Sequence, residues 1–382
     1  MYQALYRKWR PMSFDDVVSQ PHITTTLKNQ IKSGKTAHAY LFTGSRGTGK
    51  TTCARIFAKA INCLDPHDGE PCLECEICKD ADNGTLSDII EIDAASNSKV
   101  DDIRELREGV VYTPERCKYK VYIIDEVHML SAGAFNALLK TMEEPPPHVK
   151  FILATTEIHK VPATIVSRCQ HFDFHRIRNE DIVSRLMYIA SQEGFTLHED
   201  AAGMIARLSD GGMRDALSLL DQCVAYENDI TLDVVSSASG IAGRDYLFDI
   251  LEKIAEKDAA GALRVVDKLY DMSKDLKVLA GELLAQMRNV MIIKTIDNNK
   301  DLITCLPDEY ERLKALAERM KLDEILGDIN TLQECSERFA KSTSKRIELE
   351  MCIIKLCGAA QKAGATAQAA SCLLYTSPSP RD

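Results

Sequence analysis

The stretch Gly44-Ser45-Arg46-Gly47-Thr48-Gly49-Lys50-Thr51 decides the fold of the first part of the chain. It follows the apolar segment Tyr40-Leu41-Phe42 and precedes the helix-forming run 52–59. A strand, a glycine-rich loop and a helix in this order make a phosphate-binding site, because successive backbone N–H groups and the positive end of the helix face the anion. The pattern predicts a nucleoside triphosphate site made by these eight residues and Thr52. We expect Lys50 to reach the β- and γ-phosphates and the Thr51 hydroxyl to bind Mg²⁺.

A second acidic motif lies about 75 positions further on. The segment Val121-Tyr122-Ile123-Ile124 is apolar and is followed directly by Asp125 and Glu126. Acids at a strand end are often only caps for the next helix. Together with the phosphate loop, however, they predict that Asp125 holds the Mg²⁺ shell and that Glu126 acts as the catalytic base that orients the attacking water.

Two further apolar segments complete a pattern of strands that end in polar residues. Ile89-Ile90-Glu91-Ile92 leads into Asp93, and Phe151-Ile152-Leu153-Ala154 leads into Thr155. Strands that alternate with helical stretches favour a parallel sheet with helices on both faces. The carboxyl ends of such strands meet at one edge, where ligands bind. We therefore expect the polar endings to lie at a common site.

Length and composition indicate a multidomain globular protein. The 382 residues exceed one ordinary hydrophobic core, and 45% of them are hydrophobic and 27% charged. The periodicity is helical from about residue 178 to the end of the folded part. We predict an α/β domain at 1–177 with an insert at 62–80, a helical domain at 178–242, a second helical domain at 243–362 and a disordered tail at 363–382, where the abrupt change after Ser371 could also mark non-native sequence.

Several classes of protein are disfavoured. Apolar runs stay well short of the ~20 residues that a membrane-spanning helix needs, and the N-terminus lacks the apolar region of a signal peptide, so we expect a cytoplasmic protein without membrane contact. The net charge of −10 argues against broad, nonspecific adhesion to nucleic acid. Of thirteen cysteines, four lie close together in the sequence.

These four cysteines, Cys63, Cys72, Cys75 and Cys78, have spacings that permit tetrahedral metal coordination. Zinc and an iron–sulfur cluster both use four cysteines. His67 lies between them as an alternative ligand, although a free surface histidine is the commoner case. We expect a closed structural site.

Several other motifs resemble the gamma/tau family of bacterial DNA polymerase III subunits, which are AAA+ ATPases of the clamp loader. The matching stretches are Tyr6-Arg7-Lys8-Trp9-Arg10-Pro11, Glu91-Ile92-Asp93-Ala94-Ala95-Ser96, Asp125-Glu126-Val127-His128, Phe135-Asn136-Ala137-Leu138-Leu139-Lys140-Thr141-Met142-Glu143-Glu144-Pro145-Pro146, Ser167-Arg168-Cys169 and Gly211-Gly212-Met213-Arg214-Asp215-Ala216-Leu217-Ser218. The resemblance is dense to about residue 225 and weaker to about 360. It implies an α/β P-loop NTPase (AAA+) domain with a zinc-binding insert, followed by an all-α lid and an all-α collar.

The resemblance also implies partners and roles. The chain would form a hetero-pentamer with sister subunits and use ATP and Mg²⁺ to load a sliding clamp onto primer–template DNA. Arg168 would be an arginine finger that reaches the neighbouring subunit's site, and Arg214 a sensor on the lid. Either Thr156 or Thr155 would be the first sensor. Arg10, Pro11 and Val18 would border the adenine. Zinc is the metal that the resemblance favours for the four cysteines.

DNA contacts rest on the same resemblance. The helix start at Ser96–Arg104 would face DNA, which makes Lys99, Arg104 and Lys140 the candidates for phosphate contacts. A solvated helix face explains these charges about equally well. Asn97 stands where the family tends to have a basic residue, which weakens the case. Because the chain stops after the collar, the polymerase- and helicase-binding domains of longer relatives are expected to be absent.

Three other functions compete. Another AAA+ machine, such as a branch-migration helicase, would not be expected to carry the four-cysteine insert. A non-hydrolysing scaffold subunit is disfavoured by the intact Lys50, Thr51, Asp125 and Glu126. A polymerase would need paired metal-binding carboxylates outside the ATP site, which the sequence does not offer, so any polymerase label would describe the holoenzyme.

Overall fold

The structure is a computed structural model in which the chain divides into two compact units, Met1–Ser239 and Gly240–Asp382. It describes residues 3–96, 106, 108–240, 245–297, 302–303, 305, 307–339, 342 and 344–358. The predicted tail at 363–382 lies outside these ranges.

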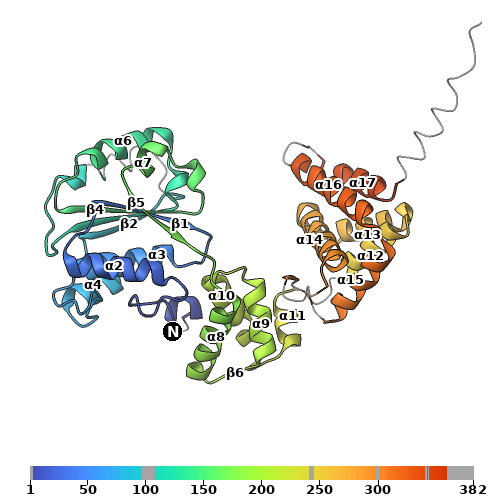
Figure 1. Ribbon diagram of the computed structural model, residues 1–382, viewed down its shortest axis with the longest axis horizontal. Helices are drawn as coiled ribbons and strands as arrows, with labels where there is room; N and C mark the ends of the chain where they lie inside the picture. The colour runs from blue at the N-terminus through green and yellow to red at the C-terminus, as the bar shows by residue number, and fades with distance from the viewer. Residues whose placement is uncertain are drawn as a thin grey trace, which may run out of the picture. The chain divides into compact units, whose positions relative to one another are not determined.

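The first unit contains the sheet and the helices around it (Figure 1). Its strands are β1 (Ala39–Gly44), β2 (Ile89–Asp93), β3 (Lys120–Asp125), β4 (Val149–Thr155), β5 (Gln170–Phe174), β6 (Thr196–Leu197) and β7 (Asp229–Ile230). Its helices are α1 (Leu5–Lys8), α2 (Pro21–Ser33), α3 (Lys50–Asn62), α4 (Glu76–Asn83), η1 (Val127–Met129), α6 (Ala132–Glu143), η2 (Ile158–Lys160), α7 (Ala163–Val166), α8 (Asn179–Glu193), α9 (Glu199–Leu208), α10 (Met213–Tyr226) and α11 (Leu232–Ala238).

The main sheet is parallel and has the strand order β2-β3-β4-β1-β5. Strand β4 therefore lies between β1, which leads into the phosphate loop, and β3, which leads into Asp125. Their register pairs Thr43 with Thr155 and Ile124 with Leu153. The carboxyl ends of the three strands are consequently neighbours, which places the predicted polar endings at one edge of the sheet.

Both faces of the sheet are covered, as the continuous apolar strands require. All seven residues of β4 are buried. One core cluster contains Phe57 of α3 and Tyr40 of β1, and a second contains Leu138 of α6 and Tyr122 of β3. Figure 1 shows α2 and α3 on one side of the sheet and α6 and α7 on the other. Burial of each large apolar side chain in these clusters contributes roughly 1.5–3 kcal/mol.

The lid that follows the sheet is made of α8, α9, α10 and α11. It also contains the short strands β6 and β7, which pair in parallel, Thr196 with Asp229 and Leu197 with Ile230. This small pair ties the loop after α8 to the loop after α10. Helical periodicity alone does not signal it.

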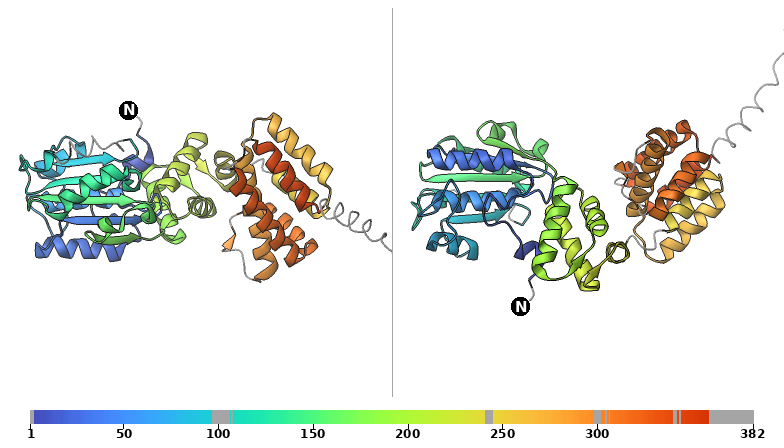
Figure 2. Two further views of the ribbon diagram at one scale, coloured as in Figure 1. Left: turned by 90° about the horizontal axis from the view of Figure 1, so that it is seen from above. Right: turned by 60° about the horizontal axis from the view of Figure 1, so that its bottom comes forward.

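The second unit, where the structure describes it, is helical (Figure 2). Its helices are α12 (Asp245–Ala255), α13 (Ala259–Asp271), α14 (Leu276–Thr295), α15 (Pro307–Arg319), α16 (Leu322–Phe339) and α17 (Lys345–Leu356). They share one apolar core, which includes Phe248, Leu283, Leu332 and Ile353. The predicted fold class is thus confirmed: a parallel α/β domain is followed by helical domains.

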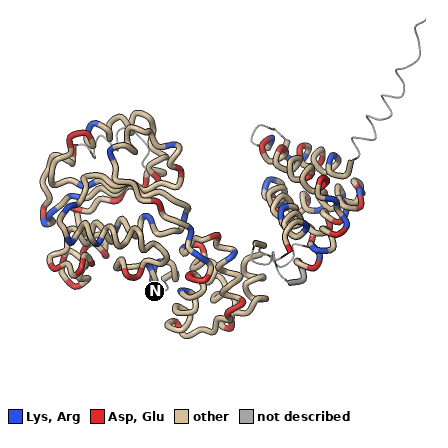
Figure 3. Tube along the Cα trace, in the orientation of Figure 1, with Lys and Arg blue, Asp and Glu red and all other residues tan. Residues whose placement is uncertain are grey.

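Charged residues of both signs are interspersed along the chain in the two units (Figure 3). Among the described helices, none combines the length and the apolar character that crossing a bilayer would require.

Candidate nucleotide-binding site

The phosphate loop lies between β1 and α3 and is shaped by glycines. Gly44, Gly47 and Gly49 have φ angles of 133°, 77° and 105°, in the left-handed region that other residues rarely adopt. Thr48 closes the loop by donating a hydrogen bond from Oγ1 to the Ser45 carbonyl at 2.8 Å. Helix α3 begins at Lys50, so its first N–H groups and its positive end lie directly behind the loop. The local geometry fits an anion.

Lys50 supplies a buried positive charge to this loop. The residue is 6% exposed, and its ammonium group donates to the carbonyl oxygens of Gly44 at 2.8 Å and Ser45 at 2.7 Å. Burial lowers the pKa of Lys50, against the opposing effects of Glu126 and Asp125. A buried cation held only by neutral carbonyls can gain from an anionic partner. The phosphates of a nucleotide match that requirement.

Thr51 and Asp125 meet across the site. The Thr51 hydroxyl donates to Asp125 Oδ2 at 2.7 Å, and Asp125 Oδ1 accepts the N–H of Glu126 at 3.0 Å. A hydroxyl and a carboxylate at hydrogen-bond distance are oxygen ligands of the kind Mg²⁺ prefers. The two predicted magnesium ligands are therefore brought together.

Glu126 has a left-handed backbone, with φ 48° and ψ 46°. This conformation is costly for a residue with a side chain, and such strain is typical of functional positions. The Glu126 Oε2 atom accepts hydrogen bonds from Thr156 Oγ1 at 2.9 Å and from Thr156 N at 3.2 Å. The carboxylate is thus held at the carboxyl end of β4.

The two threonines that the sequence left open as the first sensor have different surroundings. Thr156 contacts Glu126 directly, whereas Thr155 is fully buried and its Oγ1 lies 3.0 Å from His128 Nδ1. His128 Nδ1 also lies 3.2 Å from Glu126 Oε2. His128 was not among the predicted site residues, although it ends the quoted motif Asp125-Glu126-Val127-His128.

The lid touches the phosphate loop through its backbone. The N–H of Met213 donates to the Gly47 carbonyl at 3.0 Å, and a Cβ added to Gly47 would lie 3.0 Å from Gly212 Cα. Arg214 follows on the first turn of α10, and its guanidinium lies over the Tyr6 ring at 5.2 Å from the centroid. This contact of Tyr6 with Arg214 was not foreseen from the sequence.

The N-terminal arm, residues 4–18, reaches α3, the helix that follows the phosphate loop. Arg10 Nε donates to the Thr52 hydroxyl at 3.2 Å. Burial, followed by the nearby Arg55, lowers the pKa of Arg10. Pro11 and Val18, which precede and follow Phe14 in the sequence, are half-buried. Of the three predicted adenine neighbours, Arg10 is therefore placed against α3 by a defined hydrogen bond.

The remaining predicted residues lie elsewhere. Arg168 donates to the Thr164 carbonyl at 2.7 Å and to Glu143 Oε1 at 2.8 Å, and neither partner belongs to the phosphate loop. Its side chain is 34% exposed. Lys140 is exposed at the end of α6. Lys99 and Arg104 lie outside the described residues.

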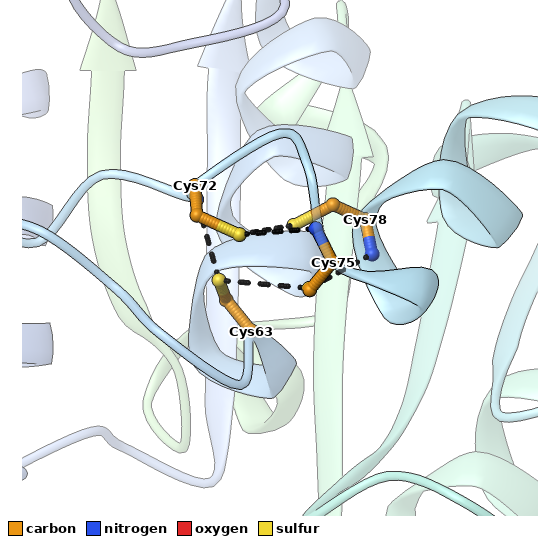
Figure 4. Close-up of side chains that lie close together, drawn as sticks. All are labelled: Cys63, Cys72, Cys75 and Cys78. Carbon is orange, nitrogen blue, oxygen red and sulfur yellow. Dashed lines mark hydrogen bonds between the residues drawn. The ribbon is translucent and has the colours of Figure 1, made fainter.

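The four cysteines form a separate cluster between the end of α3, which Cys63 caps, and the start of α4, which Cys75 caps (Figure 4). Their sulfur atoms all lie within 4.8 Å of one another, with Cys63 Sγ 4.0 Å from Cys75 Sγ and Cys72 Sγ 3.9 Å from Cys78 Sγ. Four thiolates around one Zn²⁺, each at about 2.3 Å, would lie about 3.8 Å apart. The cluster therefore fits a four-coordinate metal.

Backbone N–H groups support this cluster. The amides of Cys72, Cys75 and Cys78 donate to the sulfurs of Cys63, Cys72 and Cys75 at 3.3, 3.3 and 3.4 Å. Burial acts to raise the pKa of Cys75, but backbone hydrogen bonds from Leu64 and Cys78 help to lower it to about 7. Such donors favour the thiolate form that binds metal. His67, the alternative ligand, instead has Nε2 3.3 Å from Asp65 Oδ2.

The parallel sheet, the phosphate loop with paired acids and the helical lid define a P-loop nucleotide-binding fold with a lid. Comparison with protein families agrees. Residues 19–178 match the model described as "DNA polymerase III, delta subunit", residues 181–229 match "DNA polymerase III clamp loader subunit, ATPase lid domain", and residues 230–369 match "DNA polymerase III subunits gamma and tau domain III".

Individual relatives narrow the class. The chain is 44% identical over 365 residues to DNA polymerase III subunit tau of Bacillus subtilis. The matched region covers 95% of this chain and 65% of the relative. It is 39% identical to subunit tau/gamma of Haemophilus influenzae, over 93% of this chain and 51% of the relative. It is 40% identical to subunit gamma of Buchnera aphidicola subsp. Schizaphis graminum, over 83% of this chain and 87% of the relative.

The chain belongs to the gamma/tau family of DNA polymerase III subunits. It spans about two thirds of the Bacillus subtilis relative and about half of the Haemophilus influenzae one. Among solved structures, the Thermotoga maritima RuvB branch-migration motor matches 65% of this chain and 80% of its own at 20% identity, with a TM-score of 0.46, which is too low to add to the assignment.

Proposed function

We propose that the chain is an ATP-driven motor subunit of a bacterial clamp loader. It binds ATP at the phosphate loop and works with sister subunits in a hetero-pentamer to place a sliding clamp on primer–template DNA. The observation that carries the proposal is the convergence of Lys50 and Thr51 at the start of α3 on Asp125 and Glu126 at the end of β3. Membership of the gamma/tau family supports the clamp and the DNA as partners.

Each residue of the site has a physical role in this proposal. The loop amides and Lys50 bind the phosphates, and Lys50 leaves its carbonyl partners for the stronger anionic ones. Thr51 and Asp125 would hold Mg²⁺, which when bound neutralises charge on the phosphate oxygens. Glu126 orients the attacking water, and Thr156 fixes the position of the Glu126 carboxylate.

Two arginines connect this site to movement. Arg168, whose hydrogen-bond partners Thr164 and Glu143 lie outside the phosphate loop, would enter the site of a neighbouring subunit and stabilise the charge on the transferred phosphoryl group. Arg214, on the helix that touches Gly47, would contact the γ-phosphate in place of Tyr6. Lid position would then depend on whether ATP is bound. DNA contacts by Lys99, Arg104 and Lys140 and zinc in the four-cysteine insert belong to the same proposal.

The direct test is calorimetry with ATP and Mg²⁺ on the purified chain. We expect saturable, Mg²⁺-dependent binding by the wild type and a loss of at least about a hundredfold in affinity for Lys50→Ala, because a charge-assisted contact to phosphate disappears. Lys35→Ala, at an exposed lysine before β1, serves as the matched control. A folded wild-type chain that takes up no nucleotide would contradict the proposal.

A further inference from the structure

A turn within the cysteine-rich insert lies against helix α2. His67 and Glu70 pair as an antiparallel bridge, with N···O distances of 3.1 and 2.8 Å. At the tip of this turn, Gly69 has φ 81°, and a Cβ added there would lie 2.6 Å from the carbonyl oxygen of Lys28. The two backbones are therefore in direct contact, and only glycine fits between them.

Glu70 joins this turn to the N-terminal arm. Its Oε2 atom accepts the N–H of Phe14 at 2.8 Å, and its Oε1 atom accepts the N–H of Asp15 at 3.1 Å. The ammonium of Lys28 lies 2.5 Å from Oε1. The Glu70 side chain is 15% exposed, so these three charge-assisted contacts are largely shielded from water.

The arm that Glu70 holds reaches the nucleotide site. Phe14 is 1% exposed and belongs to the same core cluster as Phe57 of α3. Four residues before it, Arg10 bonds to Thr52, which is two positions after Lys50 on α3. Glu70 therefore fixes the arm at Phe14 and Asp15, and Arg10, nearer the start of the arm, lies beside α3, the helix that follows the phosphate loop.

Glu70 lies in the loop that the first two of the four cysteines close. Glu70 is between Cys63 and Cys72 in the chain, and Cys72 N donates to Cys63 Sγ at 3.3 Å across the base of the loop that carries it. The first part of that loop is exposed at Asp65, Pro66 and His67. Because residues 64–68 are exposed, they add little packing to hold the loop. A metal bound to four thiolates would close the loop at its base and so order it.

We propose that Glu70 is a positioning residue for nucleotide binding: it fastens the N-terminal arm to the cysteine-rich insert, so that nucleotide affinity depends on an ordered, metal-bound insert. The inference rests on the proposed ATP site. It gives the insert a role in the motor although the insert contributes no residue to the phosphate loop.

The test compares Glu70→Ala and Glu70→Gln with Glu74→Gln, an exposed glutamate four positions on in the same insert. All proteins are loaded with Zn²⁺ and their metal content is measured. We expect Glu70→Ala to bind ATP with Mg²⁺ about tenfold more weakly, because the released arm no longer holds Arg10 beside Thr52. The value of kcat should be unchanged and KM raised. Hydrogen exchange of peptides that contain Phe14 and Asp15 should accelerate, while metal content stays equal. Glu70→Gln keeps one acceptor oxygen and should fall between Glu70→Ala and the wild type.

Chelation of the wild type provides the second arm of the test. Removal of the metal from the wild type should accelerate exchange in the same peptides and raise the dissociation constant for ATP by the same factor of about ten. Chelation of Glu70→Ala should then raise its dissociation constant for ATP little further. Equal affinity of Glu70→Ala, Glu74→Gln and the wild type would overturn the inference while leaving the ATP site intact. If Glu70→Ala loses its metal, Glu70→Gln decides by the same two readouts. A wild type that binds no ATP would instead refute the proposed function.

Discussion

Asp328, on α16 of the helical unit, is a buried carboxylate with an incomplete set of partners. It is 8% exposed, and its Oδ2 atom has no hydrogen-bond partner within the part of the chain that the structure describes. Burial, assisted by Glu324 and opposed by Lys257, raises the pKa of Asp328 to about 6. An acid in such a site favours its protonated form in the folded state.

A pH dependence follows from this raised pKa. The folded protein binds the proton more tightly than the unfolded chain, so the stability that Asp328 contributes is fully present below about pH 4 and is lost as the pH rises through about 6. We expect Asp328→Asn to stabilise the isolated chain by about 1–2 kcal/mol at pH 7.5 and to change little at pH 4. Chemical unfolding at both pH values measures the difference. Equal unfolding midpoints of variant and wild type at pH 7.5 would show that Asp328 is ionised at no cost.

At the nucleotide site, the sequence identifies residues whose chemistry is tied to a motif. Lys50, Thr51 and Asp125 converge because loop and strand ends are neighbours in any parallel sheet of this order. The choice between Thr155 and Thr156 is different. It depends on which side of the strand end each hydroxyl faces, and adjacent threonines carry no pattern that decides this. His128 was missed because its contacts to Thr155 and Glu126 depend on the path of the turn after β3, which no sequence pattern indicates.

Among the elements, the cysteine-rich insert offers the clearest experiment. We expect Cys75→Ser to release the metal, because three thiolates and a hydroxyl bind it far less well than four thiolates. Hydrolysis should be reduced but retained, since no cysteine of the insert belongs to the phosphate loop. Metal analysis by mass spectrometry and an ATPase assay measure the two effects.

The matched control for this experiment is Cys117→Ser, at a cysteine outside the cluster of four. That variant should keep its metal. Full metal retention by Cys75→Ser would contradict the assignment of the four cysteines as ligands. Measurement of the bound element would also separate zinc from iron, which the cysteine spacing leaves open.

The strands illustrate which elements a sequence reveals. Strands β1, β3 and β4 are buried on both faces and are visible as apolar runs. Strand β5, Gln170–Phe174, was not predicted as a separate element. It lies at the edge of the sheet, and only Phe172 and Phe174 of its five residues are buried. Two apolar positions are too few to distinguish a strand from a loop.

At the scale of the whole molecule, the role of Arg168 requires an assembly. Because its guanidinium contacts Thr164 and Glu143 rather than the phosphate loop, we expect Arg168→Ala to leave ATP binding by the isolated chain unchanged. In the reconstituted complex with clamp and primed DNA, the same variant should hydrolyse ATP about 10³–10⁵-fold more slowly per affected site and load clamps poorly. Steady-state ATPase and clamp-loading assays measure both effects.

Lys160→Ala is a suitable control for this variant, because Lys160 is also a partly exposed cation near the end of β4, paired with Glu157. If Arg168→Ala loaded clamps as fast as this control, Arg168 would not act between subunits. The predicted domain limits at 177 and 242 stay predictions. So do the five-membered ring and the cytoplasmic location, since these two depend on other chains and on surroundings that one polypeptide does not contain.

The contact between Gly47 and Gly212 has a mechanical consequence. Main chain meets main chain there, and the Met213 amide is bonded to the Gly47 carbonyl at 3.0 Å. The Asp215 carboxylate lies beside both glycines, but the contact itself joins backbone to backbone. A rearrangement of the phosphate loop when nucleotide binds would therefore reach the start of α10 directly through the backbone hydrogen bond from Met213 to Gly47. Because backbone atoms make this link, substitutions of side chains elsewhere in the lid leave its donor and acceptor in place.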